Sequence, residues 1–211
     1  HSFPTRRSSD LGGSGLFRWR LNIEKIITLV WSSTTITIGA DCLIGPNTYI
    51  MDGTVGNGVT LDNVKLTDST VEDGADAGPF VQIRGGSVLH TGVHIGDFVE
   101  VKNSTVGAGT KSAHLTYIGD SDVGAGVNFG CGTVTVNYDG KNKSRCKIGD
   151  GAFIGCNTNL VAPVEVGDRA YIAAGSTITD DIPGDALSIA RARQVNKPGW
   201  VTEKKPYKEK K

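Results

Sequence analysis

An aliphatic residue recurs at every sixth position over most of this chain. A six-residue period matches neither the period of about 3.6 residues of an α-helix nor the two-residue alternation of an ordinary strand. It predicts a stacked β-solenoid, in which each unit is a short strand with a two-residue corner and three units form one triangular coil. The positions in the series are Ile38, Ile44 and Ile50, then Val71, Ala77, Ile83, Leu89, Ile95 and Val101, and finally Ile148, Ile154, Leu160, Val166, Ile172 and Ile178.

Glycine supports the same prediction. Gly directly follows many of these aliphatic residues, and Gly, Asn or Asp is common two places later, where a corner with positive φ favours those residue types. The chain contains 29 Gly among its 211 residues, which a helical protein would not tolerate. The sequence therefore predicts an all-β solenoid whose aliphatic side chains point to the axis.

The repeat also predicts the domain organisation. The solenoid is expected over 36–182, as roughly eight coils of about 18 residues each. The first stretch, 1–15, has no six-residue repeat and no apolar face, and it reads as a non-native cloning scar. Residues 16–35 are apolar but lie outside the repeat, so they stay unassigned. The segment 183–211 is expected to form a short helix or an extended arm with a charged tail.

Composition favours a cytoplasmic protein without nucleic-acid or membrane partners. Lys plus Arg and Asp plus Glu both number 22, so there is no overall basic field to attract nucleic acid or anionic lipid. No apolar run reaches the length of about 18 to 20 residues that a membrane span requires. The four cysteines, Cys42, Cys131, Cys146 and Cys156, form no CxxC pair, so we expect free thiols and neither a zinc knuckle nor a disulfide framework.

One interruption of the repeat is the first candidate for a functional element. Between Thr135 and Ile148 the chain reads VNYDGKNKSRCK, which is too polar and too long for a single six-residue unit. We expect this segment to leave the solenoid as an exposed loop. Loops that interrupt a rigid scaffold frequently carry function.

Three longer segments resemble one enzyme family closely. They are GPFVQIRGGS (78–87), the stretch from GDFVEVK to NYDGKNK (96–143), and the stretch from IGDGAFIG to ARARQ (148–194). The resemblance is to the acetyltransferase half of the bacterial bifunctional enzyme that makes UDP-N-acetylglucosamine, and it extends over about 38–201. The motifs HLTYIGD and NYDGKNK discriminate much better than the six-residue repeat, which many acyltransferases share.

The resemblance implies a fold, an activity and an assembly. It implies a left-handed parallel β-helix, an exception to the usual right-handed crossover, and a homotrimer with sites shared between subunits. It implies acetyl transfer from acetyl-CoA to the amine of glucosamine-1-phosphate, for UDP-N-acetylglucosamine, peptidoglycan and lipopolysaccharide precursor synthesis, with no metal. No nucleotidyltransferase domain with its glycine-rich basic loop precedes the solenoid, so we expect acetylation without uridylylation.

Acetyl transfer to a sugar amine requires a base, because the amine must lose a proton as the tetrahedral oxyanion forms. Histidine suits this task near neutral pH. His114, in KSAHLTY, matches the family's catalytic base, and Glu100, in FVEVK, matches a carboxylate near that base that could orient the imidazole. Without the motif, His114 would be read as a structural or surface residue and Glu100 as an ordinary exposed strand residue.

The resemblance also implies the binding residues. Arg84 and Lys102 match the cations that hold the sugar phosphate, Arg through paired hydrogen bonds and Lys as a point charge. Cys131, through its backbone amide, could donate to the developing oxyanion. Tyr117, Asn128 and Lys143 complete the substrate set, and Asn137, Tyr138, Cys156, Ala174 and Arg191 complete the acetyl-CoA set.

An acetyl-cysteine intermediate is disfavoured, because direct transfer needs no covalent step and no second base lies beside either Cys131 or Cys156 in sequence. The sequence departs from the family pattern in two places. Gly85 replaces a common proline, and several positions around 144–146 differ, so the outer part of the loop is less well defined.

Three other classes of protein share part of this pattern. Another hexapeptide acyltransferase, acting on serine or a different sugar, should lack the HLTY and NYDGKNK pairing. A carbonic-anhydrase solenoid needs three converging histidines, for which His90, His94 and His114 have the wrong context. A non-catalytic solenoid of the ice-binding kind would repeat Thr-x-Thr once per coil, and the three such motifs here are not spaced by whole coils.

Overall fold

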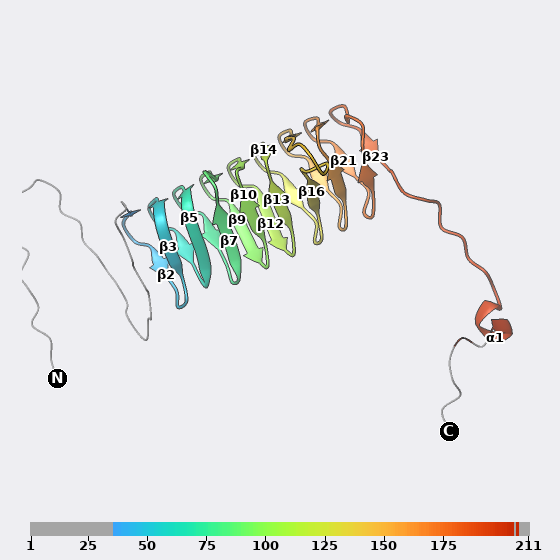
Figure 1. Cartoon of the computed structure of the whole chain (residues 1–211), viewed down its shortest axis with the longest axis horizontal. Helices are drawn as coiled ribbons and strands as arrows, with labels where there is room; N and C mark the ends of the chain where they lie inside the picture. The colour runs from blue at the N-terminus through green and yellow to red at the C-terminus, as the bar shows by residue number, and fades with distance from the viewer. Residues whose placement is uncertain (1–35, 205, 207–211) are drawn as a thin grey trace, which may run out of the picture.

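Residues 36–204 and 206 are described by this computed structural model, which is one parallel β-solenoid followed by an extended arm (Figure 1). Each coil contributes short strands that pair in parallel with the coils before and after it. The fold is the left-handed parallel β-helix expected from the sequence. The expected scar at 1–15 and the unassigned segment at 16–35 lie outside the described residues.

Face 1 of the solenoid is a nine-stranded sheet with one strand from each coil. The described part therefore holds one coil more than the eight expected. In spatial order the strands of face 1 are β2 (Leu43–Ile44), β4 (Thr60–Leu61), β6 (Asp76–Ala77), β9 (His94–Asp97), β12 (Lys111–His114), β15 (Asn128–Phe129), β18 (Phe153–Ile154), β21 (Tyr171–Ile172) and β23 (Leu187–Ser188).

Faces 2 and 3 belong to one 14-stranded sheet, because two long strands, β3 (Tyr49–Val55) and β5 (Val64–Val71), run around the corner between them. Strand β1 (Thr37–Ile38) pairs with β3. Face 2 continues through β7 (Val81–Arg84), β10 (Glu100–Lys102), β13 (Tyr117–Gly119), β16 (Val134–Val136), β19 (Asn159–Val161) and β22 (Thr177–Ile178). Face 3 continues through β8 (Val88–Leu89), β11 (Thr105–Val106), β14 (Ser121–Val123), β17 (Cys146–Ile148) and β20 (Val164–Val166).

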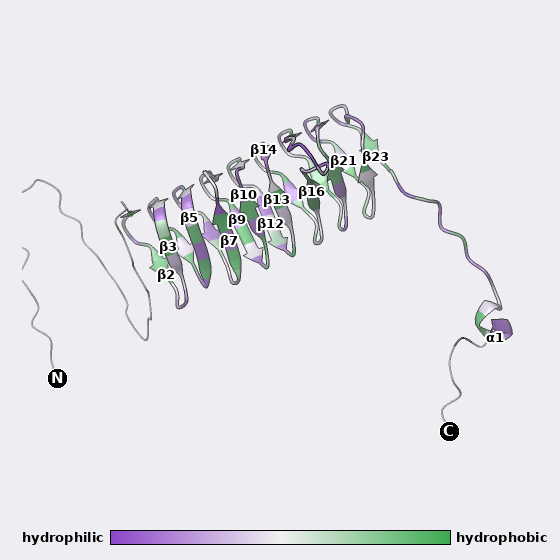
Figure 2. Cartoon of the chain, viewed as in Figure 1, coloured by the Kyte–Doolittle hydropathy of each residue, from purple (hydrophilic) through white to green (hydrophobic). Residues whose placement is uncertain are grey.

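The core consists of the aliphatic columns predicted from the repeat. Leu66, Ile83, Val101 and Ile118 stack in register on successive coils, and each has no exposed side-chain surface. Two of these stacked positions are polar, Thr135 and Ser112, and the buried Ser112 hydroxyl has no hydrogen-bond partner. Hydrophobic residues are concentrated in the strands, whereas much of the C-terminal arm is hydrophilic (Figure 2).

The solenoid extends beyond the end predicted at residue 182. The Ala186, Ser188 and Ala190 carbonyls accept hydrogen bonds from the preceding coil, and β23 pairs with β21. Only after this does the chain leave as an extended arm, which ends in the short helix α1 (Trp200–Lys204) without a buried residue. The backbone pairing of 186–190 was missed because this segment lacks a regular aliphatic series. No helix among the described residues is long and apolar enough to cross a membrane.

Candidate functional site

His114 lies at the end of β12, where face 1 turns into face 2. Its Nδ1 is 2.5 Å from Oδ1 of Asp97, its register partner on β9. The hydrogen bond from His114 holds the pKa of the Asp97 carboxyl below its ordinary value. With Nδ1–H donated to a carboxylate, the other ring nitrogen, Nε2, is left as the basic atom. Sequence reasoning missed Asp97, although it precedes His114 by 17 residues, close to one coil.

Two other histidines make the same type of pair. His90 Nδ1 is 2.9 Å from Glu72, and His94 Nδ1 is 2.5 Å from Asp76. A carboxylate one coil earlier is thus a recurrent partner for histidine in this solenoid. His114 differs in access to solvent, because its side chain is 61% exposed against 38% and 40% for His90 and His94.

Glu100 does not have the expected position beside the imidazole. Its carboxylate is 2.7 Å from Nε and 2.6 Å from Nη2 of Arg84. The reason is the fold: Glu100 lies on β10 and Arg84 on β7, both in face 2, whereas His114 lies in face 1. Within one chain Glu100 therefore does not contact the imidazole, and Asp97 makes this contact instead.

Lys102 is engaged in a largely buried polar network. Its Nζ lies 3.1 Å from Asp120 Oδ2, and the two side chains are 16% and 5% exposed. The Asp120 carboxylate also accepts from the Asn103 and Asn137 amides, and Asn137 lies 3.3 Å from the Tyr117 hydroxyl. Burial raises the pKa of Asp120, but hydrogen bonds from Asn103, Lys102 and Asn137 outweigh it, so the net pKa is lowered.

Asn128 lies on face 1, in the same sheet as His114. Its register partners are Lys111 on one side and Phe153 on the other. The Phe153 ring stacks on Tyr171 with a centroid separation of 4.5 Å. Asn128 therefore lies between a cation and an aromatic pair on an open sheet surface.

A column of residues continues from His114 along the same corner. Ser112 pairs with Phe129, Phe129 with Ile154, and Ile154 with Ile172. The residues two positions after these four are His114, Cys131, Cys156 and Ala174. The same register places them one above another on successive coils. The Arg191 side chain lies against the next position, since a Cβ on Gly175 would be 3.7 Å from Arg191 Cδ. We call this set the corner column; its members are Asp97, His114, Cys131, Cys156, Ala174 and Arg191.

The predicted loop leaves between β16 and β17 and is tied at both ends. Tyr138 and Lys143 form an antiparallel bridge, and the Asp139 carboxylate accepts from the Lys141 and Asn142 amides at 2.7 and 2.6 Å.

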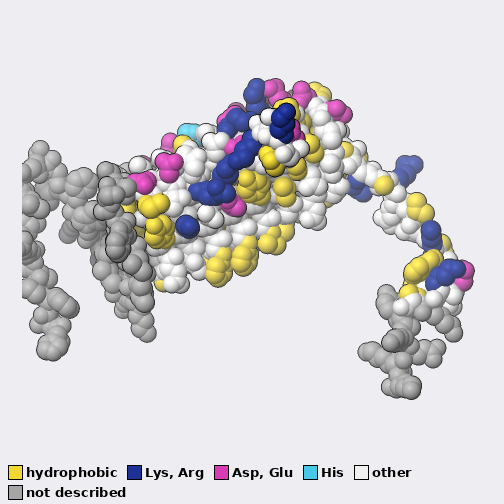
Figure 3. Space-filling model, viewed as in Figure 1, with side chains coloured by type: hydrophobic (Ala, Val, Ile, Leu, Met, Phe, Trp, Pro, Cys, Tyr) yellow, Lys and Arg dark blue, Asp and Glu magenta, His cyan; other side chains and the backbone are white. Residues whose placement is uncertain are grey.

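Side chains of Lys and Arg gather in a band beside exposed hydrophobic groups on the face seen in Figure 3.

Arg145 fixes the returning limb of this loop. Its Nη1 and Nη2 donate to the Asn103 and Ser121 carbonyls at 3.0 and 3.1 Å, and its Nε donates to Asp122 at 3.0 Å. The hydrogen bond from Arg145 lowers the pKa of Asp122. This clamp was not predicted, because the carbonyls that it binds belong to different coils.

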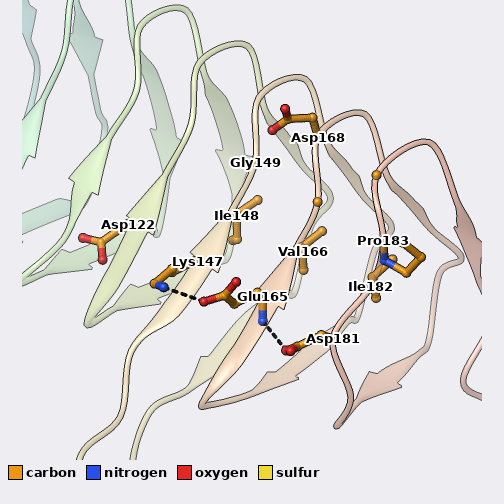
Figure 4. Close-up of a pocket in the computed structure, with 12 residues that line it drawn as sticks. Asp122, Lys147, Ile148, Gly149, Glu165, Val166, Asp168, Asp181, Ile182 and Pro183 are labelled. Atoms are coloured by element: carbon orange, nitrogen blue, oxygen red, sulfur yellow. Dashed lines mark hydrogen bonds and ion pairs between the residues drawn. The ribbon is translucent and has the colours of Figure 1, made fainter.

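A hollow of ≈ 610 Å³ on face 3 contains none of the predicted site residues (Figure 4). Lys147 Nζ lies 2.5 Å from Glu165, and the Glu165 amide donates to Asp181 at 2.8 Å. The charged side chains Lys147 and Glu165 are thus paired with each other, and the Asp181 carboxylate is bound by a backbone amide. Across the described coils, no group of three His, Cys, Asp or Glu side chains is placed to hold a metal ion.

The predicted residues fall on two faces of the prism. His114 and Asn128 are on face 1, whereas Arg84, Lys102 and Tyr117 are on face 2. Adjacent faces of a triangular prism look in different directions, so these two groups do not close around one pocket within the described residues of a single chain. The corner between them carries three exposed apolar side chains, Phe80, Phe98 and Leu115.

Comparison with known proteins gives the following relations. The family model for bacterial transferase hexapeptide (six repeats) matches residues 145–180, and the model for the hexapeptide repeat of succinyl-transferase matches 35–63. Bifunctional protein GlmU of Geobacillus sp. (strain WCH70) is 57% identical over 178 residues, covering 82% of this chain and 39% of that protein. Bifunctional protein GlmU of Clostridium kluyveri is 56% identical over 167 residues, covering 79% of this chain and 37% of that protein.

The chain therefore spans less than half the length of these relatives. Among solved structures, perosamine N-acetyltransferase from Caulobacter crescentus matches with 20% identity and a TM-score of 0.42, over 58% of this chain and 53% of that chain. UDP-N-acetylglucosamine acyltransferase from Campylobacter jejuni matches with 19% identity and a TM-score of 0.42, over 88% of this chain and 79% of that chain.

Proposed function

Because this chain is 57% identical over 178 residues to a bifunctional GlmU protein, we propose that it belongs to that family and that its solenoid transfers acetyl from acetyl-CoA to the amine of glucosamine-1-phosphate. The observation that carries the proposal is the corner column. An exposed His114, oriented by Asp97 at 2.5 Å, heads a line of the positions assigned to the coenzyme. Three steps between coils, at about 4.8 Å each, separate His114 from Ala174, so an extended thioester arm can lie along the corner with its reactive end at the base.

The chemistry follows from the orientation of the imidazole. Asp97 accepts from Nδ1–H, so Nε2 accepts the amine proton as the amine nitrogen attacks the thioester carbon. The carbonyl oxygen becomes an oxyanion, for which the Cys131 amide is a suitable donor, since it makes no hydrogen bond among the described residues. Collapse of the intermediate expels the coenzyme thiolate, which receives the proton from His114. Asp97 stabilises the imidazolium while it carries that proton.

The sugar phosphate is assigned to the cations of face 2. Arg84 is 39% exposed and bound to Glu100, so a phosphate can share the guanidinium from its open side. Lys102 is held by Asp120 and contributes mainly as a fixed positive charge behind Arg84. The remaining assigned residues are Tyr117, Asn128 and Lys143 for the sugar phosphate, and Asn137, Tyr138, Cys156, Ala174 and Arg191 for acetyl-CoA.

A complete site requires a second copy of the chain. The base on face 1 and the cations on face 2 diverge, so the base of one copy would meet the cations of its neighbour in a closed threefold ring. The exposed Phe80, Phe98 and Leu115 lie at the corner between these faces and would be covered by that contact. We assign the activity to the cytoplasm, in the supply of precursors for UDP-N-acetylglucosamine.

The test is release of free thiol from acetyl-CoA by the purified chain, with and without glucosamine-1-phosphate. Thiol release that depends on glucosamine-1-phosphate, and that is weak with glucosamine or serine, is expected. Equal rates with glucosamine and its 1-phosphate would refute the substrate assignment, and activity on serine alone would indicate a different hexapeptide acyltransferase.

A further inference from the structure

Two of the four cysteines occupy the same position of consecutive coils. Gly precedes each one, at 130 and 155, and a residue with positive φ follows each one, Gly132 at 77° and Asn157 at 55°. The Asn157 amide donates to the Cys131 carbonyl at 2.8 Å. Together with the pairing of Phe129 with Ile154, this places Cys131 directly over Cys156.

The spacing of these positions suits a covalent bridge. Residues stacked on neighbouring parallel strands lie about 4.8 Å apart, within the range of about 4.4 to 6.8 Å between Cα atoms of disulfide-bonded cysteines. The coils are in close contact here, as they are at other corners, since a Cβ on Gly130 would lie 2.5 Å from the Cys156 amide nitrogen. Gly130 and Gly132 give the backbone around Cys131 freedom to adjust the side-chain directions.

The other two thiols lack this arrangement. Cys146 is buried on face 3, and burial raises the pKa of its thiol to about 11, so little thiolate is present near neutral pH. Cys42 lies near the first described coil, and its thiol donates to the Gly56 carbonyl at 3.0 Å. Cys156 is exposed and Cys131 is partly exposed, and they are the two cysteines that lie on adjacent coils.

We propose that Cys131 and Cys156 are a redox modification site that a small-molecule disulfide converts into an intramolecular disulfide. The exposed Cys156 thiolate attacks one sulfur of the reagent, forming a mixed disulfide and releasing one thiol. The Cys131 thiolate then attacks Cys156 Sγ and releases the second thiol. The protein loses two electrons and two protons, and the reagent is reduced to two thiols.

The bridge acts on the corner column. It turns both sulfurs toward each other between His114 and Ala174, and it removes the Cys156 thiol from the surface assigned to acetyl-CoA. The oxidised chain therefore loses coenzyme binding, and reduction restores it. This consequence rests on the proposed function, whereas formation of the bridge does not.

The bridge is tested first without any substrate. The full chain is incubated with oxidised glutathione, alkylated, digested with trypsin and analysed by mass spectrometry. Cys131 and Cys156 fall in separate tryptic peptides, 112–141 and 148–169. We expect these two peptides to be linked, with loss of about 2 Da relative to their sum, while Cys42 and Cys146 are recovered alkylated.

Matched variants identify the order of the steps. Cys131→Ser is expected to stop at a mixed disulfide on Cys156, and Cys156→Ser is expected to react slowly or not at all. A stable mixed disulfide in the wild type would overturn the proposal, and so would a link between copies seen on a non-reducing gel or full alkylation of both cysteines after oxidation.

Binding of acetyl-CoA is then measured by calorimetry on the oxidised and reduced chain. Loss of binding on oxidation and recovery with dithiothreitol support control of the coenzyme site. Equal binding by both forms would remove that control while leaving the bridge established. Failure of the reduced chain to bind acetyl-CoA at all would instead count against the proposed function.

Discussion

His114 and Asp97 are brought together by backbone register, since they are Cα partners on adjacent strands. The contact is therefore formed whenever these coils are formed, and it does not rely on two mobile side chains meeting. His94 has an equivalent partner, Asp76, on the same face. Substituting the histidine of each pair therefore distinguishes a catalytic role of His114 from a purely structural one.

We expect His114→Ala to lower kcat by about 10² to 10⁴-fold with little change in the affinity for acetyl-CoA, because the substitution removes a proton acceptor and no binding contact. Steady-state kinetics with both substrates measures this. His94→Ala is the control, because it removes a similar carboxylate pair and should leave kcat nearly unchanged. Similar loss of kcat in both variants, or an equal loss of coenzyme affinity in the His114 variant, would make His114 a structural residue.

Arg84→Ala is expected to raise KM for glucosamine-1-phosphate by about tenfold to hundredfold, and KM for acetyl-CoA much less, because charge-assisted hydrogen bonds to phosphate contribute about 1.5 to 3 kcal/mol. Substitution of Arg84 is a better test than substitution of Lys102. Removing Lys102 would also leave the nearly buried Asp120 carboxylate without its cation. Glu100→Gln is the control, since it keeps the shape of the pair and frees the guanidinium. Equal changes in both KM values in Arg84→Ala would end the phosphate assignment.

At the scale of the strand, Ser112 is an exception in the aliphatic column. It lies between Ile95 and Phe129, and its buried hydroxyl has no partner. We expect Ser112→Ala to raise the free energy of unfolding by about 1 kcal/mol, because an unsatisfied polar group is removed. Urea denaturation measures the change.

Ser104→Ala is the matched control for this prediction. Ser104 is also buried, but its hydroxyl donates to the Lys102 carbonyl at 2.9 Å and accepts from the Ser121 amide at 2.9 Å. This variant should be less stable than the wild type. Destabilisation of the same size in both variants would show that the Ser112 hydroxyl is satisfied.

The Asp120 network joins β10, β13 and the start of the loop. Its hydrogen bonds hold the pKa of Asp120 below the ordinary value of 3.8. A depressed carboxyl pKa contributes stability that is present above the ordinary pKa and is lost as the pH falls through the depressed pKa. The stability difference between wild type and Asp120→Asn should therefore be largest near pH 7 and shrink below about pH 4. Urea denaturation across this range tests it, and a difference independent of pH would contradict it.

The sequence predicted the strands of the solenoid better than it predicted which side chains meet between neighbouring coils. Axial residues such as Ile83 and Ile154 repeat locally, so the solenoid could be read directly from their spacing. The contact of His114 with Asp97 depends on which residues lie one coil apart. The coil length varies from 16 to 18 residues and reaches 25 where the loop between β16 and β17 is inserted. Within one chain Glu100 does not reach His114, because the three residues from Asp97 to Glu100 carry the chain around a corner to another face.

At the scale of the whole molecule, the corner between faces 1 and 2 combines an unfavourable backbone conformation with exposed apolar side chains. Phe80, Phe98 and Leu115 have φ values of 59°, 58° and 45°, a region that bulky side chains rarely adopt. All three are more than half exposed, at 55%, 55% and 57%. Phe80 and Phe98 stack with a centroid separation of 5.0 Å, which makes a continuous apolar ridge. A strained, exposed apolar ridge is typical of a surface that another chain covers.

We therefore expect the active form to be a trimer in which this ridge is buried and the base of one copy faces the cations of another. Sedimentation velocity combined with the thiol-release assay on the same fractions measures both properties. Phe98→Ser should dissociate the assembly and abolish activity together, because the two halves of each site separate. Leu43→Ser, which changes a similarly exposed residue on β2 at 58% exposure, should do neither. An active monomer at assay concentration would exclude shared sites, since the base and the cations would then have to act from two diverging faces of one chain.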